Sequence, residues 1–240
     1  MIILRTTNLW FVKTDYNTIT MAQIETELQL LKTEAVNMWT LVNSQLSKAR
    51  QAFLHFDKDL AREVVLKEKR VNGSELKIDR DCENIFALFC PVAIDLRFLL
   101  AVLKINSNLE RIGDIAEGIA RYIIDAEAPF TKELLEITGI LPMYEEAVRM
   151  LMDTQAAFEQ EDTVLARSVF KRDDLLDNVN KNVNKVLETH LEGHAEDTAQ
   201  ALWILSIIRK LERVGDQSKN IAEEIIFYLE AKVLKHQGKK

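Results

Sequence analysis

The sequence predicts an all-α protein that consists of two tandem three-helix bundles. The chain of 240 residues contains only 7 Gly and 3 Pro, too few for the many turns of an all-β or βαβ protein. Long segments carry apolar residues at helical spacing, and 48% apolar with 29% charged residues is typical of an ordered globular chain. The phrase LERIGD, residues 109–114, returns as LERVGD at residues 211–216, which indicates a duplicated unit.

Local breakers divide the chain into six expected helices. Pro91 suits the first turn of the third helix, where its missing N–H costs nothing. That helix should end before Ala128, because the residue before Pro129 is disfavoured in the α region. Gly193 should separate the last two helices. The helices are expected at residues 20–55, 58–87, 91–127, 132–159, 162–191 and 196–234.

The two halves align along their whole length. Asp57 and the following AxxV motif recur from Asp162 onwards, at an offset of 105 residues, whereas AVNM at residue 35 matches AVRM at residue 147. The first copy is therefore seven residues longer in its first helix, which is two turns and preserves the buried face. Short connections imply antiparallel neighbouring helices. We expect one three-helix repeat over residues 20–128 and a second over residues 132–234.

Charge and hydropathy narrow the classes of function. A net charge of −7 without a basic stripe argues against a nucleic-acid partner. The most apolar stretch is interrupted by Asp95, Arg97 and Lys104, so no membrane span is expected. The N-terminus lacks the features of a signal peptide, which favours the cytoplasm. Cys82 and Cys90 have no CxxC spacing and are expected to be reduced, buried thiols.

The repeated phrase carries paired carboxylates. Glu110 and Asp114 are four residues apart and share a helix face, and Glu212 with Asp216 repeats the arrangement. This face lies more than a quarter turn from the apolar seam, on the outside of the bundle or in a groove beside it. Two acids at this spacing repel by roughly 0.2–0.5 kcal/mol in an isolated helix. A bound cation would offset that repulsion.

The alternative for such acids is an ordinary solvated face, and for an isolated pair that is the usual explanation. The similarity between the two copies of this segment argues against a merely solvated face here. Residues 109–123 and 211–225 are identical at 8 of 15 positions, including the Glu, Arg and Asp that packing alone does not require. The sequence therefore predicts a cation site in each half.

The preceding helix of each half supplies further oxygen ligands. Asp173 and Asp177 form a second acid pair, and Glu68 with Asn72 occupies the equivalent positions in the first half. Ligation by oxygen alone suits Mg²⁺, Mn²⁺, Ca²⁺ or iron. Asn72 supplies an oxygen without a charge, so the first site is the weaker one.

Several motifs together resemble the PhoU family of phosphate-uptake regulators. They are DKDLAREVV, CPVAIDLR, LERIGDIAEGIA and LERVGDQSKNIAEEI, and the resemblance extends from about residue 24 to residue 228. It implies surface metal sites that hold iron or zinc, and manganese and magnesium remain candidates because oxygen ligands suit them. Where the family often has His after Gly-Asp, this chain has Ile115 and Gln217, and Gly118 replaces an Asn that Asn220 retains. The implied ligands are Glu110, Asp114, Glu212, Asp216, Asp173 and Asp177, with Glu68 and Asn72 as the weaker pair.

The resemblance also implies a function without catalysis. Members of the family are cytoplasmic adaptors that couple the ATPase subunit of a phosphate ABC transporter to a sensor histidine kinase and repress the phosphate-starvation response. A homodimer is expected, with membrane contact only through partner proteins. The chain contains no Gly-rich phosphate loop, no Ser/His/Asp set and no nucleophile elbow.

Other classes of protein remain as alternatives. A phosphopeptide-binding helical adaptor would need a cluster of arginines in one groove, whereas the arginines here, Arg111 and Arg213 among them, are scattered. A metal-free helical scaffold would have no use for the doubled acids. A di-iron carboxylate protein would need Glu-x-x-His motifs on two facing helices, and this chain has none at its repeated phrase. His190 and His194 have the spacing of a zinc pair, but Gly193 between them indicates a helix end instead.

Overall fold

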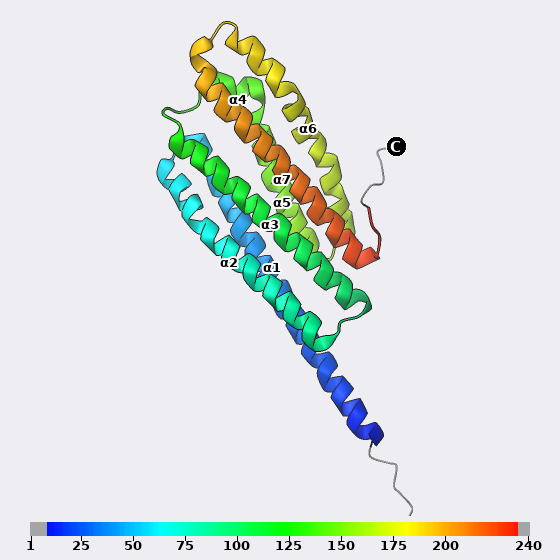
Figure 1. Cartoon of the computed structure of the whole chain (residues 1–240). Helices are drawn as coiled ribbons and strands as arrows, with labels where there is room; N and C mark the ends of the chain where they lie inside the picture. Colours follow the sequence, from blue (N-terminus) through cyan, green and yellow to red (C-terminus); the bar gives the residue numbers. More distant parts are fainter. Residues whose placement is uncertain (1–8, 235–240) are drawn as a thin grey trace, which may run out of the picture.

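Over the part of the chain that the structure describes, the regular secondary structure consists of helices, with no strand. A computed structural model describes residues 9–234, with side chains from residue 22 onwards. Its fold confirms the all-α prediction, and the helices run through two adjacent bundles (Figure 1). The elements are α1 (Leu9–His55), α2 (Lys58–Phe89), α3 (Ala93–Asp125), α4 (Lys132–Thr138), α5 (Ile140–Gln160), α6 (Thr163–Leu191), the 3₁₀ turn η1 (Ala195–Asp197) and α7 (Thr198–Glu230).

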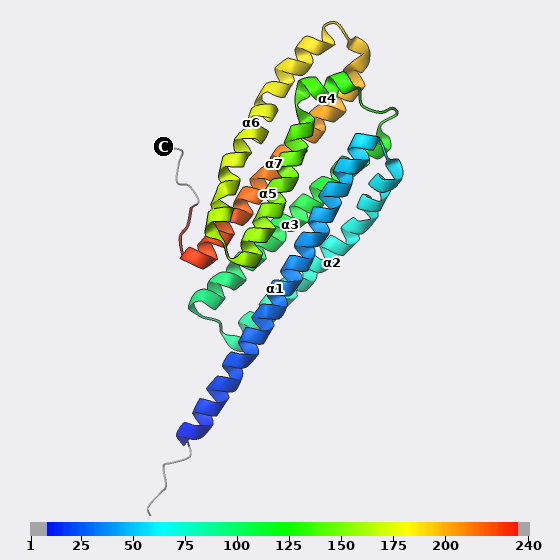
Figure 2. The same ribbon diagram turned by 180° about the vertical axis from the view of Figure 1, so that it is seen from behind.

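Helices α1, α2 and α3 form the first bundle, and α5, α6 and α7 form the second. The bundles meet along two lines, α3 against α7 and α1 against α5. Helices α2, α3, α7 and α6 lie on the face seen in Figure 1, and α1 and α5 lie on the opposite face (Figure 2). The N-terminal turns of α1 project beyond both bundles. None of the described helices combines the length and apolarity that a membrane span requires.

Equivalent capping residues start the middle helix of each bundle. Asp57 precedes α2, and its carboxylate accepts hydrogen bonds from the backbone N–H groups two and three residues later, at 3.0 and 2.9 Å. Asp162 caps α6 in the same way, at 2.8 and 3.0 Å. These bonds satisfy N–H groups that have no partner within the helix. The two aspartates that revealed the repeat are therefore its N-caps.

The predicted helix over residues 132–159 is wrong, because two helices cover that segment. Gly139 adopts a left-handed conformation, with φ of 66°, and separates α4 from α5. Glycine enters this region without the steric penalty that a Cβ atom brings. The chain thus has seven α-helices in the described range rather than the expected six.

Three smaller expectations also need correction. Pro91 lies outside α3, which begins two residues later, at Ala93, because Cys90 turns the chain in a left-handed conformation. Cys82 is buried as expected, but Cys90 at this turn is exposed. The last helix ends at Glu230 rather than at residue 234.

The interface between the bundles has approximate twofold symmetry. Asn220 of α7 donates a hydrogen bond to Asn108 of α3, at 3.5 Å. At the offset of 102, these positions correspond to Gly118 and Lys210, and the Lys210 ammonium fills the space that a Cβ at Gly118 would need. The reciprocal pairing shows that α3 and α7 cross antiparallel and that each repeat presents the same surface to the other.

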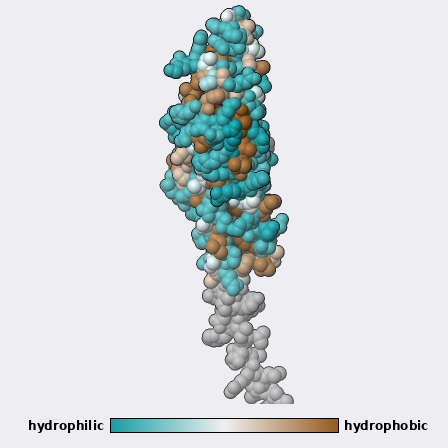
Figure 3. Space-filling model, turned by 90° about the vertical axis from the view of Figure 1, so that its left-hand side faces the viewer, coloured by the Kyte–Doolittle hydropathy of each residue, from teal (hydrophilic) through white to brown (hydrophobic). Residues whose placement is uncertain are grey.

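The outer side of the first bundle is mainly hydrophilic. Figure 3 shows the left-hand side of the molecule of Figure 1, where hydrophilic residues predominate and apolar patches are scattered among them. Helix α2, on this side of the molecule, carries the exposed Leu66 and Leu76. Isolated apolar side chains of this kind are normal on a protein surface.

Candidate metal centre

The glycine of the repeated phrase lets a carboxylate of α2 lie against the backbone of α3. A Cβ atom at Gly113 would lie 3.2 Å from both carboxylate oxygens of Glu68 and 3.1 Å from Cγ1 of Val71. Both distances are shorter than ordinary van der Waals contact. The absence of a side chain at Gly113 therefore makes room for the Glu68 carboxylate in the groove between the two helices.

Glu68 is a buried acid with one unsatisfied oxygen. Its exposed fraction is 5%, and its Oε2 accepts a hydrogen bond from Nε2 of Gln45 at 2.9 Å. Its Oε1 is buried without a hydrogen-bond partner. Burial raises the pKa of Glu68 to about 7 against the lowering effect of Gln45, and the charges of Asp114 and Glu110 add to the rise.

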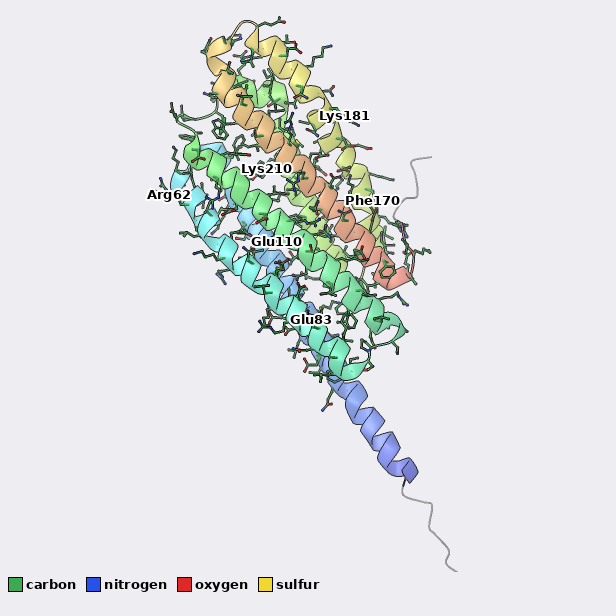
Figure 4. All side chains as sticks on the ribbon, viewed as in Figure 1. Arg62, Glu83, Glu110, Phe170, Lys181 and Lys210 are labelled. Atoms are coloured by element: carbon green, nitrogen blue, oxygen red, sulfur yellow. The ribbon has the colours of Figure 1, made fainter. Side chains whose placement is uncertain are left out.

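Three further carboxylates surround this groove. Burial raises the pKa of Glu110, and the charges of Asp114 and Glu75 raise it further. The pKa of Glu75 is raised for the same reasons, by burial and by Asp79 and Asp114. In the part of the chain with described side chains, Glu68, Glu75, Glu110 and Asp114 form no ion pair with Lys or Arg. Figure 4 shows Glu110 on the stretch of α3 that runs beside α2.

The structure brings Glu75, rather than Asn72, toward the pair on α3. Asn72 is exposed and makes no side-chain hydrogen bond among the described residues. On a helix of 3.6 residues per turn, a residue seven positions after Glu68 lies closer to its direction than one four positions after it. The sequence contains the seven-residue spacing from Glu68 to Glu75, but alignment of the two repeats matches Asp177 with Asn72 instead.

In the second repeat, the acid and the amide have changed places at the positions of Asn72 and Glu75. Asn72 corresponds to Asp177, whereas Glu75 corresponds to Asn180. Each middle helix therefore carries two acids, at different spacings. In α6, Asp173 is 6% exposed and its Oδ1 has no hydrogen-bond partner. Burial raises its pKa.

Gly215 has the same role as its equivalent in the first repeat. A Cβ atom there would lie 2.8 Å from Oδ1 of Asp173 and 2.6 Å from Cδ2 of Leu176. The helices α6 and α7 therefore approach more closely at this point than any other residue would permit. The glycine in the repeated phrase is explained by helix packing against a buried acid.

We call Glu68, Glu75, Glu110 and Asp114 the first cluster, and Asp173, Asp177, Glu212 and Asp216 the second. A lysine joins the acids of the second cluster. The Lys219 ammonium donates to Oδ2 of Asp173 and lies 2.8 Å from Oδ1 of Asp216. Burial disfavours the charge of Lys219, but its hydrogen bonds to the two aspartates outweigh burial and raise its pKa above the ordinary value. Glu212 completes the cluster, and burial together with Asp216 and Asp177 raises its pKa.

Neither cluster is arranged as a closed coordination site. Among the described side chains, no three His, Cys, Asp or Glu groups are placed together closely enough to hold a metal ion. The donor chemistry nevertheless suits a hard cation in the first repeat, where the buried Oε1 of Glu68 lacks any partner. Coordination there requires rotation of the partly exposed Glu110 and the exposed Asp114 side chains.

The two histidines are engaged with each other and with the turn before α7. Nε2 of His190 lies 2.8 Å from Oδ2 of Asp197, and the rings of His190 and His194 stack with centroids 4.4 Å apart. Nδ1 of His194 lies 3.1 Å from the backbone oxygen of His190. These contacts organise the end of α6, consistent with a structural role.

The known proteins that this chain resembles belong to one family. A family model described as the PhoU domain matches the chain twice, over residues 36–123 and 140–225. The phosphate-specific transport system accessory protein PhoU of Edwardsiella tarda is 33% identical over 222 residues, covering 92% of this chain and 90% of that protein. The protein of the same name from Escherichia coli (strain K12) is 31% identical over 216 residues, covering 90% and 89%.

Solved structures agree with this match. The crystal structure of PhoU from Pseudomonas aeruginosa has a TM-score of 0.79 and 29% sequence identity, and the match covers 87% of this chain and 99% of that one. A phosphate transport system regulatory protein PhoU from Streptococcus pneumoniae has a TM-score of 0.76 and 27% identity, with 88% and 99% covered. With two domain matches, and relatives alike along nearly their whole length, this chain belongs to the PhoU family.

Proposed function

We propose that this chain is a cytoplasmic accessory protein that modulates high-affinity phosphate transport and represses the phosphate-starvation response when phosphate is plentiful. This proposal rests on the alignment of about nine-tenths of this chain with relatives named phosphate-specific transport system accessory proteins. Its proposed partners are the ATPase subunit of the transporter and a sensor histidine kinase, and it acts on them by binding rather than by catalysis. A homodimer in solution is part of the proposal, to be checked by sedimentation.

Deletion of the gene tests the regulatory role. Expression of a phosphate-starvation reporter should rise in phosphate-rich medium and return to its low level when the wild-type gene is restored. Reporter expression in phosphate-poor medium should change little, because repression is already relieved there. An unchanged reporter in rich medium would refute the proposal. Co-purification with the ATPase subunit and with the kinase tests the two partners separately.

We further propose that the first cluster binds a metal ion. Glu68, Glu75, Glu110 and Asp114 offer oxygen ligands from two helices, and the orphaned Oε1 of Glu68 would gain a partner. Magnesium, manganese, iron and zinc are the candidate ions. A bound cation would neutralise the repelling carboxylates and join α2 to α3. The second set from the sequence, Glu212, Asp216, Asp173 and Asp177, remains a candidate, and Lys219 contacts two of its acids.

The two interpretations of the first cluster predict opposite effects of Asp114→Asn. If the cluster binds metal, this substitution should lower the bound metal and the melting temperature in the presence of that ion, since a ligand present at 100 times its Kd stabilises the folded state by about 2.7 kcal/mol. On a merely solvated face the same change should be neutral or stabilise by roughly 0.2–0.5 kcal/mol, because the repulsion is relieved.

The measurement is the melting temperature with Mn²⁺, Fe²⁺, Zn²⁺, Mg²⁺ or a chelator, together with elemental analysis. Glu83→Gln is the matched control, since Glu83 is an exposed acid elsewhere on α2 (Figure 4). If no ion raises the wild-type melting temperature and the protein contains no metal, the chain is a metal-free helical adaptor.

A further inference from the structure

The two acid clusters differ at one position of the repeat. The buried acids Glu68 and Asp173 are equivalent, and so are the acids that follow the two glycines, Asp114 and Asp216. Three residues after those acids, the first repeat has Glu117 and the second has Lys219. A negative charge in one copy thus stands where the other copy has a positive charge.

The side chains at this position make different contacts. Glu117 pairs along its own helix with Arg121, at 2.6 Å. Lys219 instead reaches across the groove to Asp173 of α6, while it also contacts Asp216 on α7, at 2.8 Å. Its ammonium group therefore lies between the acids of the two helices, in the place where a bound cation would bridge them.

We infer that Lys219 is a built-in cation that occupies the second acid cluster, so that metal binding by this chain is confined to the first cluster. The inference rests on the proposed metal binding of the first cluster. It reverses the expectation from sequence, in which Asn72 made the first site the weaker one. Oδ2 of Asp173 and Oδ1 of Asp216 are engaged by the ammonium, which would also repel a divalent cation at this distance.

The consequence is a functional asymmetry between two similar repeats. A covalently attached charge that is always present bridges the acids of α6 and α7. A bridge between the acids of α2 and α3 would instead require a bound metal ion. Changes in metal supply should therefore affect the packing of the first bundle and leave the second unchanged.

The test uses the full-length protein in a background that lacks the first site, with Glu110→Gln and Asp114→Asn combined. Lys219→Met is introduced into this background, since methionine keeps an unbranched side chain and removes the charge. If Lys219→Met folds poorly, Lys219→Gln serves as a second variant, because glutamine retains a hydrogen-bond donor for Asp173. Lys171→Met is the control, because Lys171 is an exposed lysine of α6 with no ion pair among the described residues. Circular dichroism confirms the fold of each protein.

Binding of Mn²⁺ is measured by electron paramagnetic resonance and titration calorimetry. The background protein and its Lys171→Met form should show no saturable Mn²⁺ binding up to the highest concentration titrated. Lys219→Met or Lys219→Gln should bind Mn²⁺ with a Kd at least about tenfold below that concentration, or about 1.4 kcal/mol. The inference is overturned if the background protein still binds Mn²⁺ through the second cluster, or if no Lys219 variant gains binding. If wild-type protein binds no metal but a Lys219 variant does, the proposed first site fails while the role of Lys219 stands.

Discussion

At the scale of residues, the repeated phrase combines a packing requirement with a chemical one. Its glycine is buried against an acid of the preceding helix, which is Glu68 in one repeat and Asp173 in the other. Glycine destabilises a helix interior by about 1 kcal/mol relative to alanine, so its presence needs a cause. The cause is the close approach of a carboxylate that the helix pair has to accommodate.

Replacement of Gly215 by alanine should therefore destabilise the protein. The new methyl group would overlap Cδ2 of Leu176 and Oδ1 of Asp173, and both are fixed by burial. We expect the free energy of unfolding, measured with urea, to fall by about 1–3 kcal/mol. Gly73→Ala is the control, since nothing lies within 4 Å of a Cβ at Gly73 of α2, and it should stabilise by about 1 kcal/mol. Equal stability of Gly215→Ala and wild type would contradict the packing argument.

The buried carboxyl of Glu68 should make stability depend on pH. Its pKa is about 7 in the folded protein against 4.5 for an ordinary glutamate. Because the folded state favours the protonated form, the stabilisation is complete below pH 4.5 and is lost as pH rises to 7. Glu68→Gln cannot lose a proton, so its stability relative to wild type should increase between pH 5 and pH 8, by up to about 3 kcal/mol.

Urea unfolding at the two pH values, with a chelator present, measures this difference. Glu63→Gln on the same helix is the control, because Lys48 and Lys67 lower the pKa of Glu63 to about 2. Its carboxylate is already ionised at pH 5, so its replacement should produce no such gain. A parallel pH dependence in Glu68→Gln and wild type would show that the Glu68 carboxyl is ionised throughout.

At the scale of elements, helix ends depend on single residues. Asp57 and Asp162 start α2 and α6 with equivalent hydrogen bonds, whereas Gly139 divides a segment that is otherwise helical on both sides. The break directs the short helix α4 away from the axis of α5, where it contacts α6. A helical apolar pattern alone cannot locate such a break, since both flanking segments follow it.

Alanine at Gly139 should reveal the cost of the left-handed turn. An L-residue in this conformation is less favourable by roughly 1–2 kcal/mol, and the added Cβ would lie at an ordinary contact distance, 3.7 Å from Cγ2 of Val179. Thermal unfolding of Gly139→Ala should therefore show a loss of about that size, caused by conformation rather than by overlap. Gly193→Ala should cost less, because Gly193 has no positive φ and no neighbour within 4 Å. Equal losses in both variants would contradict the assignment.

At the scale of the whole molecule, the approximate twofold arrangement joins the repeats into one body. Asn43 of α1 donates a 2.6 Å hydrogen bond to Gln155 of α5. These two residues occupy equivalent positions when the first helices of the two repeats are aligned. Trp39 contacts Phe158 across the same boundary, with ring centroids 5.3 Å apart. Each bundle therefore buries part of its apolar surface only against the other.

This shared core should make the two repeats unfold together. Trp39 lies on α1 and Trp203 on α7, and each packs on an aromatic ring of the other bundle. Two variants that each retain one of them, with Trp10 also replaced by phenylalanine, therefore follow the boundary from each side. In each variant the urea midpoint from fluorescence should coincide with the midpoint from circular dichroism. Midpoints that differ between fluorescence and circular dichroism would show that the repeats unfold independently.

Most of the local structure was determined by the sequence itself. Apolar spacing predicted the long helices, the 102-residue and 105-residue offsets predicted the duplication, and the spacing of Glu110 and Asp114 placed both acids on one face off the seam. These properties depend on residues close together in the chain or on direct comparison of two segments. Local spacing and the similarity of two segments are both visible in the sequence alone.

The composition of the acid clusters was decided only by the tertiary structure. The relative rotation of α2 and α3 brings Glu75 to the α3 acids in place of Asn72, and the packing of α6 on α7 brings Lys219 to Asp173, 46 positions away in the chain. Which side chains meet in a groove depends on the rotation and spacing of both helices, set by the packing of the whole core. A pattern within one helix contains no information about that rotation.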